Sequence, residues 1–340
     1  MRKSAQEKYL GNTVHESGDT TYQIDERLVK GRSVISQISA ILNTIPFGPA
    51  RVQAGIYLRN SKFLGVLLFS IEAWHGITRE DIHRLERLDL ELLRIILYRA
   101  HSKTSEDFIY LELGLLKIRY IVKSRRVLYL QAILWRKDTD LVKQYLMVQR
   151  QHRSKGDFHF LVKKDLEDLN FKLEDKEIIE MGKNTLKNNI KKKLMEIAFN
   201  DYSKGISKLS KVKNIRYTTL KIQEYLVSPL LNDNQRKLLI KLRSKMEDIK
   251  SNFKKKYQDL DCPLKCDKTH VDSQENLLVC TKLKINHNSV SHADLFKGVQ
   301  SKKEAVITFQ KLLIQRKQVI KETNKKSSPM HCFPKHVQHV

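Results

Sequence analysis

The chain has 340 residues, 41% hydrophobic and 30% charged, and its 64 basic and 38 acidic residues give a formal net charge of +26. This length suffices for one large domain or two to three smaller ones, and four cysteines are too few for a disulfide framework. So large a positive surplus repels itself unless a polyanion neutralises it, so we expect RNA or DNA as the partner.

Targeting and membrane signals are weak in this sequence. The N-terminal residues Met1 to Glu7 lack the apolar core of a signal peptide. The longest apolar run, Phe63 to Ile71, is much shorter than the roughly 20 residues that cross a bilayer. We therefore expect a reduced intracellular protein, nuclear or cytoplasmic, with no membrane partner.

A mainly α fold is predicted, because only 12 glycines and six prolines interrupt a sequence rich in Leu, Ile, Lys and Glu. The exception is a short N-terminal β-hairpin within residues 8–24. Its expected strands are Lys8–Gly11 and Thr20–Ile24, on either side of a polar turn at Glu16–Asp19.

Helical patterns then follow one another. Apolar residues from Ile24 to Leu42 recur at spacings near three and four, which predicts an amphipathic helix. A strongly apolar segment covers residues 50–72, Thr78 is the expected N-cap of a third helix, and a long helix is expected from about Ile118 to Trp135. Residues 30–150 are thus predicted to form a compact helical bundle.

A polar linker with short helices is predicted at residues 151–180, before a basic helical region at residues 181–260. That region holds 20 basic and seven acidic side chains. A helix beginning near Asp233 carries a stripe of apolar residues that we interpret as core packing, with a partner-binding face as the alternative: Leu239, Leu242, Met246, Ile249 and Phe253. The stretch from Asn184 to Lys193 is either a nuclear-import patch or a solvated helix face.

Three cysteines, Cys262, Cys266 and Cys280, gather in a small predicted module at residues 261–298, and no cysteine precedes them. A final helix is expected at residues 299–322. Residues 323–340 resemble a disordered tail. The tail contains a second group of metal-ligand residue types with no apolar framework to hold them: His331, Cys332, His336 and His339.

Several of these segments resemble the region after the catalytic palm in non-LTR retrotransposon reverse transcriptases. The N-terminal similarity lies in Tyr9-Leu10-Gly11, Ile24, Arg27, Leu67 to Trp74, Leu85-Glu86, Leu93 to Leu97 and Leu111-Glu112-Leu113-Gly114. The C-terminal similarity lies in Gln223 to Leu226, Leu238 to Met246, Lys250 to Phe253, Cys262 to Cys280 and Asp294-Leu295-Phe296. The resemblance implies a palm-edge hairpin at residues 1–29, a thumb-like bundle at residues 30–150 and a terminal zinc-knuckle-like module.

The resemblance also implies a structural zinc ion, with Cys262, Cys266, His270 and Cys280 as ligands. The family pattern has a histidine four positions before the last cysteine, where this chain has Asn276. Asparagine is a poor zinc ligand, so His270 or His287 would have to replace that histidine. The alternative is three reduced thiols without a metal.

The chemistry of the parent polymerases is missing from this sequence. Those enzymes hold two metal ions with aspartates that include an adjacent pair, and no Asp-Asp dipeptide occurs here. No nucleophilic triad, phosphate-binding loop or dinucleotide fingerprint replaces it. We therefore predict no catalytic residues and no small-molecule substrate.

Sequence-independent RNA or DNA binding is the leading functional hypothesis. The expected phosphate contacts are the basic residues Lys191, Lys192, Lys193, Lys211, Lys213, Arg216, Arg236, Arg243, Lys254, Lys255 and Lys256. Three alternatives stay open: a fragment of a full RNA-directed DNA polymerase whose palm is missing from an incomplete gene prediction, a helical protein-interaction scaffold, and a remnant without function.

Overall fold

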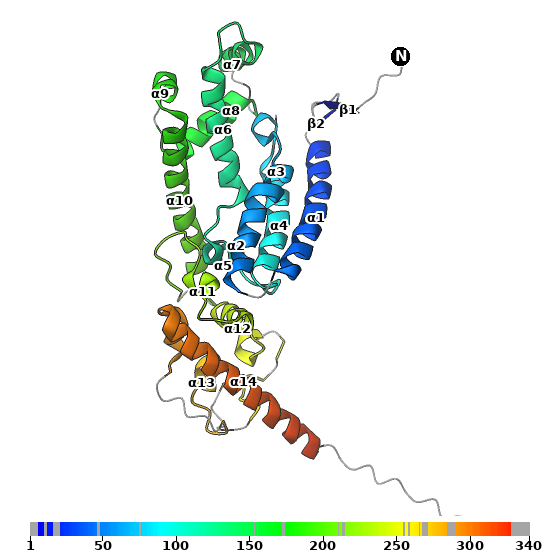
Figure 1. The fold of residues 1–340 in the computed structure, drawn as a ribbon, viewed down its shortest axis with the longest axis vertical. Coiled ribbons are helices and arrows are strands. Elements are labelled where there is room, and N and C mark those ends of the chain that lie inside the picture. Colours follow the sequence, from blue (N-terminus) through cyan, green and yellow to red (C-terminus); the bar gives the residue numbers. More distant parts are fainter. Residues whose placement is uncertain are drawn as a thin grey trace, which may run out of the picture. The chain divides into compact units, whose positions relative to one another are not determined.

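A computed structural model gives the arrangement of the chain (Figure 1), which divides into two compact units at Asn232/Asp233. The structure describes residues 6–9, 12–15, 21–45, 48–74, 76–152, 154, 156–171, 174–209, 211–212, 215–253, 256–257, 259–264, 266, 271–283 and 290–327. The prediction of a mainly helical fold is confirmed, because helices make up nearly all the regular structure of these residues.

Among the described residues, the only sheet is an antiparallel pair of four-residue strands, β1 (Gln6–Tyr9) and β2 (Asn12–His15). Gln6 pairs with His15 and Tyr9 with Asn12, so both strands lie before the predicted turn at Glu16–Asp19. The predicted strand Thr20–Ile24 is wrong, because Thr21 begins helix α1 (Thr21–Thr44) and Ile24 is fully buried on that helix.

The first unit continues from α1 through a run of closely packed helices, α2 (Pro49–Leu58), the π-helical turn η1 (Arg59–Phe63), α3 (Leu64–Leu67), the 3-10 turn η2 (Ile71–Ala73) and α4 (Arg79–Ile96). Thr78 caps α4 as predicted. Its hydroxyl accepts from the Asp81 amide at 3.1 Å, and the Asp81 carboxylate accepts from the Thr78 amide at 3.0 Å. This reciprocal pair satisfies two amides that a helix start leaves without partners.

A buried ion pair joins α4 to η1 and to α5 (Glu106–Leu113). The Asp89 carboxylate accepts from Nε and Nη2 of Arg59 at 2.7 and 2.6 Å and from the Tyr110 hydroxyl at 2.9 Å. Burial lowers the pKa of Arg59, but the Asp89 carboxylate more than restores it. Burial also raises the pKa of Tyr110, so its hydroxyl keeps its proton and donates it to Asp89.

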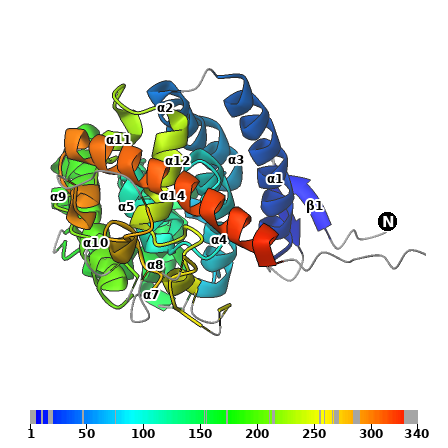
Figure 2. The same cartoon turned by 90° about the horizontal axis from the view of Figure 1, so that it is seen from below.

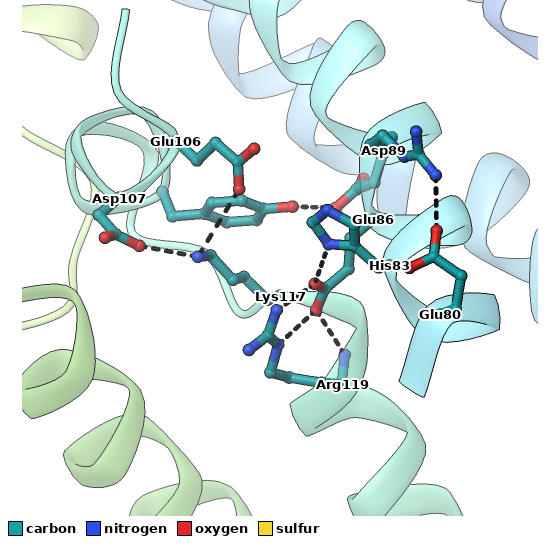
Figure 3. Close-up of polar contacts among 10 residues, drawn as sticks. Glu80, His83, Glu86, Asp89, Glu106, Asp107, Lys117 and Arg119 are labelled. Carbon is teal, nitrogen blue, oxygen red and sulfur yellow. Dashed lines mark hydrogen bonds and ion pairs between the residues drawn. The ribbon is translucent and has the colours of Figure 1, made fainter. Parts of the chain in front are cut away.

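Further charged groups lie near Asp89 on α4, α5 and the start of α6 (Ile118–Leu134), as Figure 3 shows. Glu86 is buried and accepts from Arg119 Nε at 2.8 Å, and these hydrogen bonds raise the pKa of Arg119. Lys117 donates to Asp107 at 2.7 Å. Each carboxylate of this group that faces the core is therefore neutralised within the unit.

The rest of the first unit is built on α6, whose bounds confirm the predicted long helix. Against it lie α7 (Leu141–His152), α8 (Phe158–Asp168), α9 (Asp175–Glu180) and α10 (Lys183–Ser207). Val162, Leu169 and Ile178 are buried, so the segment predicted as a linker at residues 151–180 contributes to the core of this unit.

Helix α10 is attached by one narrow row of side chains spaced four residues apart: Leu186, Ile190, Leu194, Ala198, Tyr202 and Ile206. The row faces α5 and α6 (Figure 1). Tyr202 is anchored by the Lys117 amide, which donates to its hydroxyl at 2.8 Å. Most of the remaining surface of α10 is exposed.

The end of α5 is held by the chain segment before α11 (Glu224–Val227). Glu112 is fully buried and accepts from the hydroxyls of Tyr217 and Tyr225, both at 2.6 Å. Gly114 follows with φ of 65°, and a Cβ there would lie 2.3 Å from the Ile222 nitrogen. This position therefore requires glycine for two reasons, which are its left-handed backbone conformation and the close approach of another backbone segment.

The second unit contains α12 (Asp233–Arg243), η3 (Lys250–Phe253), α13 (Gln274–Leu277), η4 (His292–Phe296) and α14 (Val299–Ser327). The apolar stripe from Leu239 onward was expected on one helix, but α12 ends at Arg243 and Lys245 adopts a left-handed conformation with φ of 51°. Leu239, Leu242, Met246 and Ile249 are nevertheless buried, which favours the core-packing interpretation.

Helix α14 lies against α12 (Figure 2) and also contacts η4. Its buried residues include Ala305, Val306, Phe309 and Leu312. It continues to Ser327, so the expected start of a disordered tail at residue 323 is wrong. The remaining tail, with His331, Cys332, His336 and His339, lies outside the described residues.

We expect Gly114→Ala to lower the free energy of unfolding by more than about 2 kcal/mol, because an L-residue resists positive φ and its methyl group overlaps the backbone of Ile222. Urea denaturation measures this. The control is Gly65→Ala on α3, where the new methyl meets nothing within 4 Å and should be neutral or stabilising. Equal midpoints for the two variants would contradict the packing described for Gly114.

Candidate metal centre and basic surface

Three thiols lie together in the second unit. The sulfur atoms of Cys262, Cys266 and Cys280 are all within 4.8 Å of one another. In a tetrahedral site with Zn–S bonds of about 2.3 Å, sulfurs lie about 3.8 Å apart. The three side chains therefore need only a small adjustment to hold one metal ion.

Local structure brings these cysteines together. Asp261 and Val271 form an antiparallel bridge that closes the loop carrying Cys262 and Cys266. The Ser273 hydroxyl then accepts from the Asn276 amide at 3.1 Å and starts α13, whose turn leads to Cys280. A short loop and a capped helical turn thus present sulfurs from both sides, as spacing in the sequence predicted.

The thiols occupy a partly apolar setting. Cys280 is 3% exposed, and Cys262 and Cys266 are half-buried. Burial raises the pKa of both the Cys262 and the Cys280 thiols. Because metals bind the thiolate, binding must displace these protons and will weaken as pH falls.

Two polar residues line the same small cavity as the thiols. Asn276 donates from Nδ2 to the Val271 carbonyl at 2.9 Å, so its amide supports the bridge next to the cysteines. Arg316 of α14 donates to buried Asp272 at 2.7 Å. The cysteine loop is thereby tied to the long C-terminal helix.

Among the described residues, no histidine or carboxylate lies close enough to the three sulfurs to serve as a fourth ligand. His270, the predicted fourth ligand, and His287 both lie outside the described residues. Asn276 lies beside Cys262 and Cys280, at the place where the family resemblance expects the histidine.

The predicted phosphate contacts differ in their exposure to solvent. Lys191, Lys192, Arg216 and Lys256 are exposed, while Lys193 and Lys211 are half-buried. Lys213, Lys254 and Lys255 lie outside the described residues.

Arg236 and Arg243 were wrongly predicted as phosphate contacts, because they are 0% and 3% exposed. Arg236 pairs with Asp233 at 2.7 Å. Arg243 donates to the Leu295 carbonyl at 2.9 Å and lies over the Phe296 ring. Both guanidinium groups therefore stabilise the second unit from inside.

Two further lysines that were not predicted as phosphate contacts lie on the same exposed surface of α10. Lys183 and Lys187 are exposed on α10 and precede Lys191 at four-residue intervals, so the three form one row with a spacing of about 6 Å. Residues 183–193 hold five lysines and no acid. The four-residue spacing was the sequence signal that would have added them.

A groove of about 800 Å³ between α4, α6 and α8 is also lined by cations. Unlike the lysines of the α10 row, several of these cations form ion pairs. Arg119 pairs with Glu86, and Arg126 pairs with Asp165 at 2.6 Å. Lys123 pairs with Asp168. Three of the five Lys and Arg side chains that line this groove are thus engaged with acids of the first unit, so the groove is less suited to an added anion than the α10 row is.

No family model, curated protein or solved structure matches this chain. Among the described helices, none has both the length and the apolar character needed to span a bilayer.

Proposed function

We propose that this chain is a non-catalytic nucleic-acid-binding protein whose α10 lysine row contacts the phosphate backbone without reading sequence. The observation that carries the proposal is the stretch of residues 183–193, which holds five lysines and no acid. Lys183, Lys187, Lys191 and Lys192 are exposed, while Lys193 pairs with Glu196 at 3.7 Å. Like charges four residues apart destabilise a helix by about 0.2–0.5 kcal/mol per pair. A phosphate backbone would remove that repulsion and release counterions.

We further propose that the chain derives from the C-terminal part of a non-LTR retrotransposon reverse transcriptase and lacks its polymerase chemistry. The support is the resemblance of its motifs, two of which contact each other. Glu112, in the Leu111–Gly114 motif, accepts from Tyr225, in the Gln223–Leu226 motif. One packed junction therefore unites segments that lie more than 100 residues apart.

We propose zinc as the metal of the cysteine site. Cysteine thiolates are typical zinc ligands, and the three sulfurs, within 4.8 Å of one another, need only a small adjustment to reach tetrahedral spacing. Cys262, Cys266 and Cys280 would supply three ligands and His270 the fourth. The ion would act structurally, by cross-linking the cysteine loop to the α13 turn.

Salt titration of nucleic-acid binding tests the α10 surface. If Lys183, Lys187, Lys191 and Lys192 each neutralise a phosphate, the logarithm of the affinity for single-stranded RNA falls against log[salt] with a slope of about −3 or steeper. We expect Lys→Gln at 183, 187 and 191 together to reduce that slope by about 2. Filter binding between 50 and 300 mM salt measures both values.

The matched control removes the same net charge elsewhere, by Lys→Gln at the exposed positions 30, 62 and 103. It should leave the slope nearly unchanged. Absence of binding at 50 mM salt would overturn the proposed function, and equal slopes for the two triple variants would remove α10 from it.

Zinc content tests the metal proposal. We expect one zinc ion per wild-type chain by elemental analysis after dialysis, and a loss of most of it in Cys280→Ser because one of the thiolate ligands is gone. Cys332→Ser is the control and should keep the ion. A wild-type chain without zinc, or full zinc content in Cys280→Ser, would sink the assignment.

A further inference from the structure

Helix α7 carries an exposed apolar stripe in the first unit. Leu141, Tyr145 and Val148 are 79%, 62% and 46% exposed and lie at positions i, i+4 and i+7 of the helix. Met147 beside them is 38% exposed. The opposite side of α7 is already in use, since Leu146 and Gln149 are buried against the unit. The stripe is therefore a second apolar face on one helix.

This outer face also lacks charge. The exposed residues of α7 are Leu141, Gln144, Tyr145, Met147, Val148, Gln151 and His152, and none of them is Lys, Arg, Asp or Glu. In the whole chain 30% of the residues are charged.

The charged residues of α7 point elsewhere. Lys143 has a side chain that is 15% exposed, pairs with Asp138 at 2.8 Å and donates to the Leu134 carbonyl at 3.1 Å. Arg150 pairs with Asp175 of α9. Both cations are thus held by the protein itself, at the edges of the apolar face.

A cavity of about 150 Å³ lies next to the face. It is lined by Trp74, Tyr129, Val142, Tyr145, Leu146 and Phe158, among other residues. Tyr145 belongs to both the stripe and the cavity wall. The face thus combines projecting apolar side chains with an apolar recess beside them.

Charge identifies the occupant of this face. A partner with an acidic surface would be attracted by exposed lysines, and α7 exposes none. A second copy of this chain carries the same charge of +26, so two copies repel each other least through a face on which neither exposes a cation. We propose that the chain forms a symmetric dimer through the outer face of α7.

Symmetry fixes how the two helices meet. In a two-fold dimer the same patch is used by both copies, so the two α7 helices cross antiparallel near Tyr145. Leu141 of one copy then faces Val148 of the other, across a stripe about 10 Å long. The recess beside Tyr145 in each copy receives an apolar side chain of the other copy.

The test measures the mass of the nucleic-acid-free full chain by sedimentation equilibrium in 1 M NaCl, where a Debye length of about 3 Å screens the mutual repulsion. We expect wild type to be dimeric at 20 μM. Tyr145→Glu should weaken the dimer at least 100-fold, because two carboxylates would be buried opposite each other. Tyr57→Glu on α2, where the tyrosine is 69% exposed, is the matched control and should stay dimeric.

Circular dichroism of each variant verifies that the fold is intact. A wild-type chain that is monomeric at 100 μM overturns the proposal, including the case in which α7 binds a different protein. Equal dissociation in Tyr145→Glu and Tyr57→Glu also overturns it. RNA binding by Tyr145→Glu is expected to match wild type, so this outcome is independent of the lysine row.

Discussion

The buried carboxylate of Asp89 is the interaction on which the first unit depends. It receives two hydrogen bonds from Arg59 and one from Tyr110, and all three side chains are 1% exposed or less. Removing one partner of a buried ion pair typically costs about 3–5 kcal/mol, because the other charge is left without compensation. This one group therefore fixes the relative positions of η1, α4 and α5.

Internal pairing leaves the surplus of positive charge on the surface. Asp89 is buried with Arg59 and Asp272 with Arg316, so each of these pairs removes one acid and one cation together. On the first three turns of α10 only a narrow apolar row is buried, and Lys183, Lys187, Lys191 and Lys192 are exposed.

Periodicity and capping chemistry predicted much of the helical structure. The Thr78 cap and the bounds of α6 depend on local sequence, and both could be predicted from it. The end of α12 could not be predicted from local sequence, because the apolar spacing continues to Phe253 although the helix ends before the left-handed Lys245. A glycine often marks the left-handed residue that ends a helix, whereas a lysine does not predict this conformation.

Site prediction succeeded where spacing alone decides and failed where burial decides. The short spacing from Cys262 to Cys266 and the capped turn before Cys280 brought the thiols together as expected. Arg236 and Arg243 were misplaced because charge alone suggested solvent. Both lie three or four residues from the buried Leu239 and Ile240, so the helical period places them on the buried side of α12.

We propose that repulsion within the α10 lysine row lowers the stability of the free protein, and that a polyanion removes this repulsion. Thermal unfolding at low salt, with and without single-stranded RNA, tests it most directly in wild type and in the variant with Gln at 183, 187 and 191. Without RNA the variant should melt higher, by about 1–4 °C, since two like-charge pairs are gone and Gln forms helix as well as Lys. With RNA the order should reverse, because wild type gains three phosphate contacts that the variant lacks. A variant that melts no higher without RNA, or that gains as much from RNA as wild type does, would contradict the account.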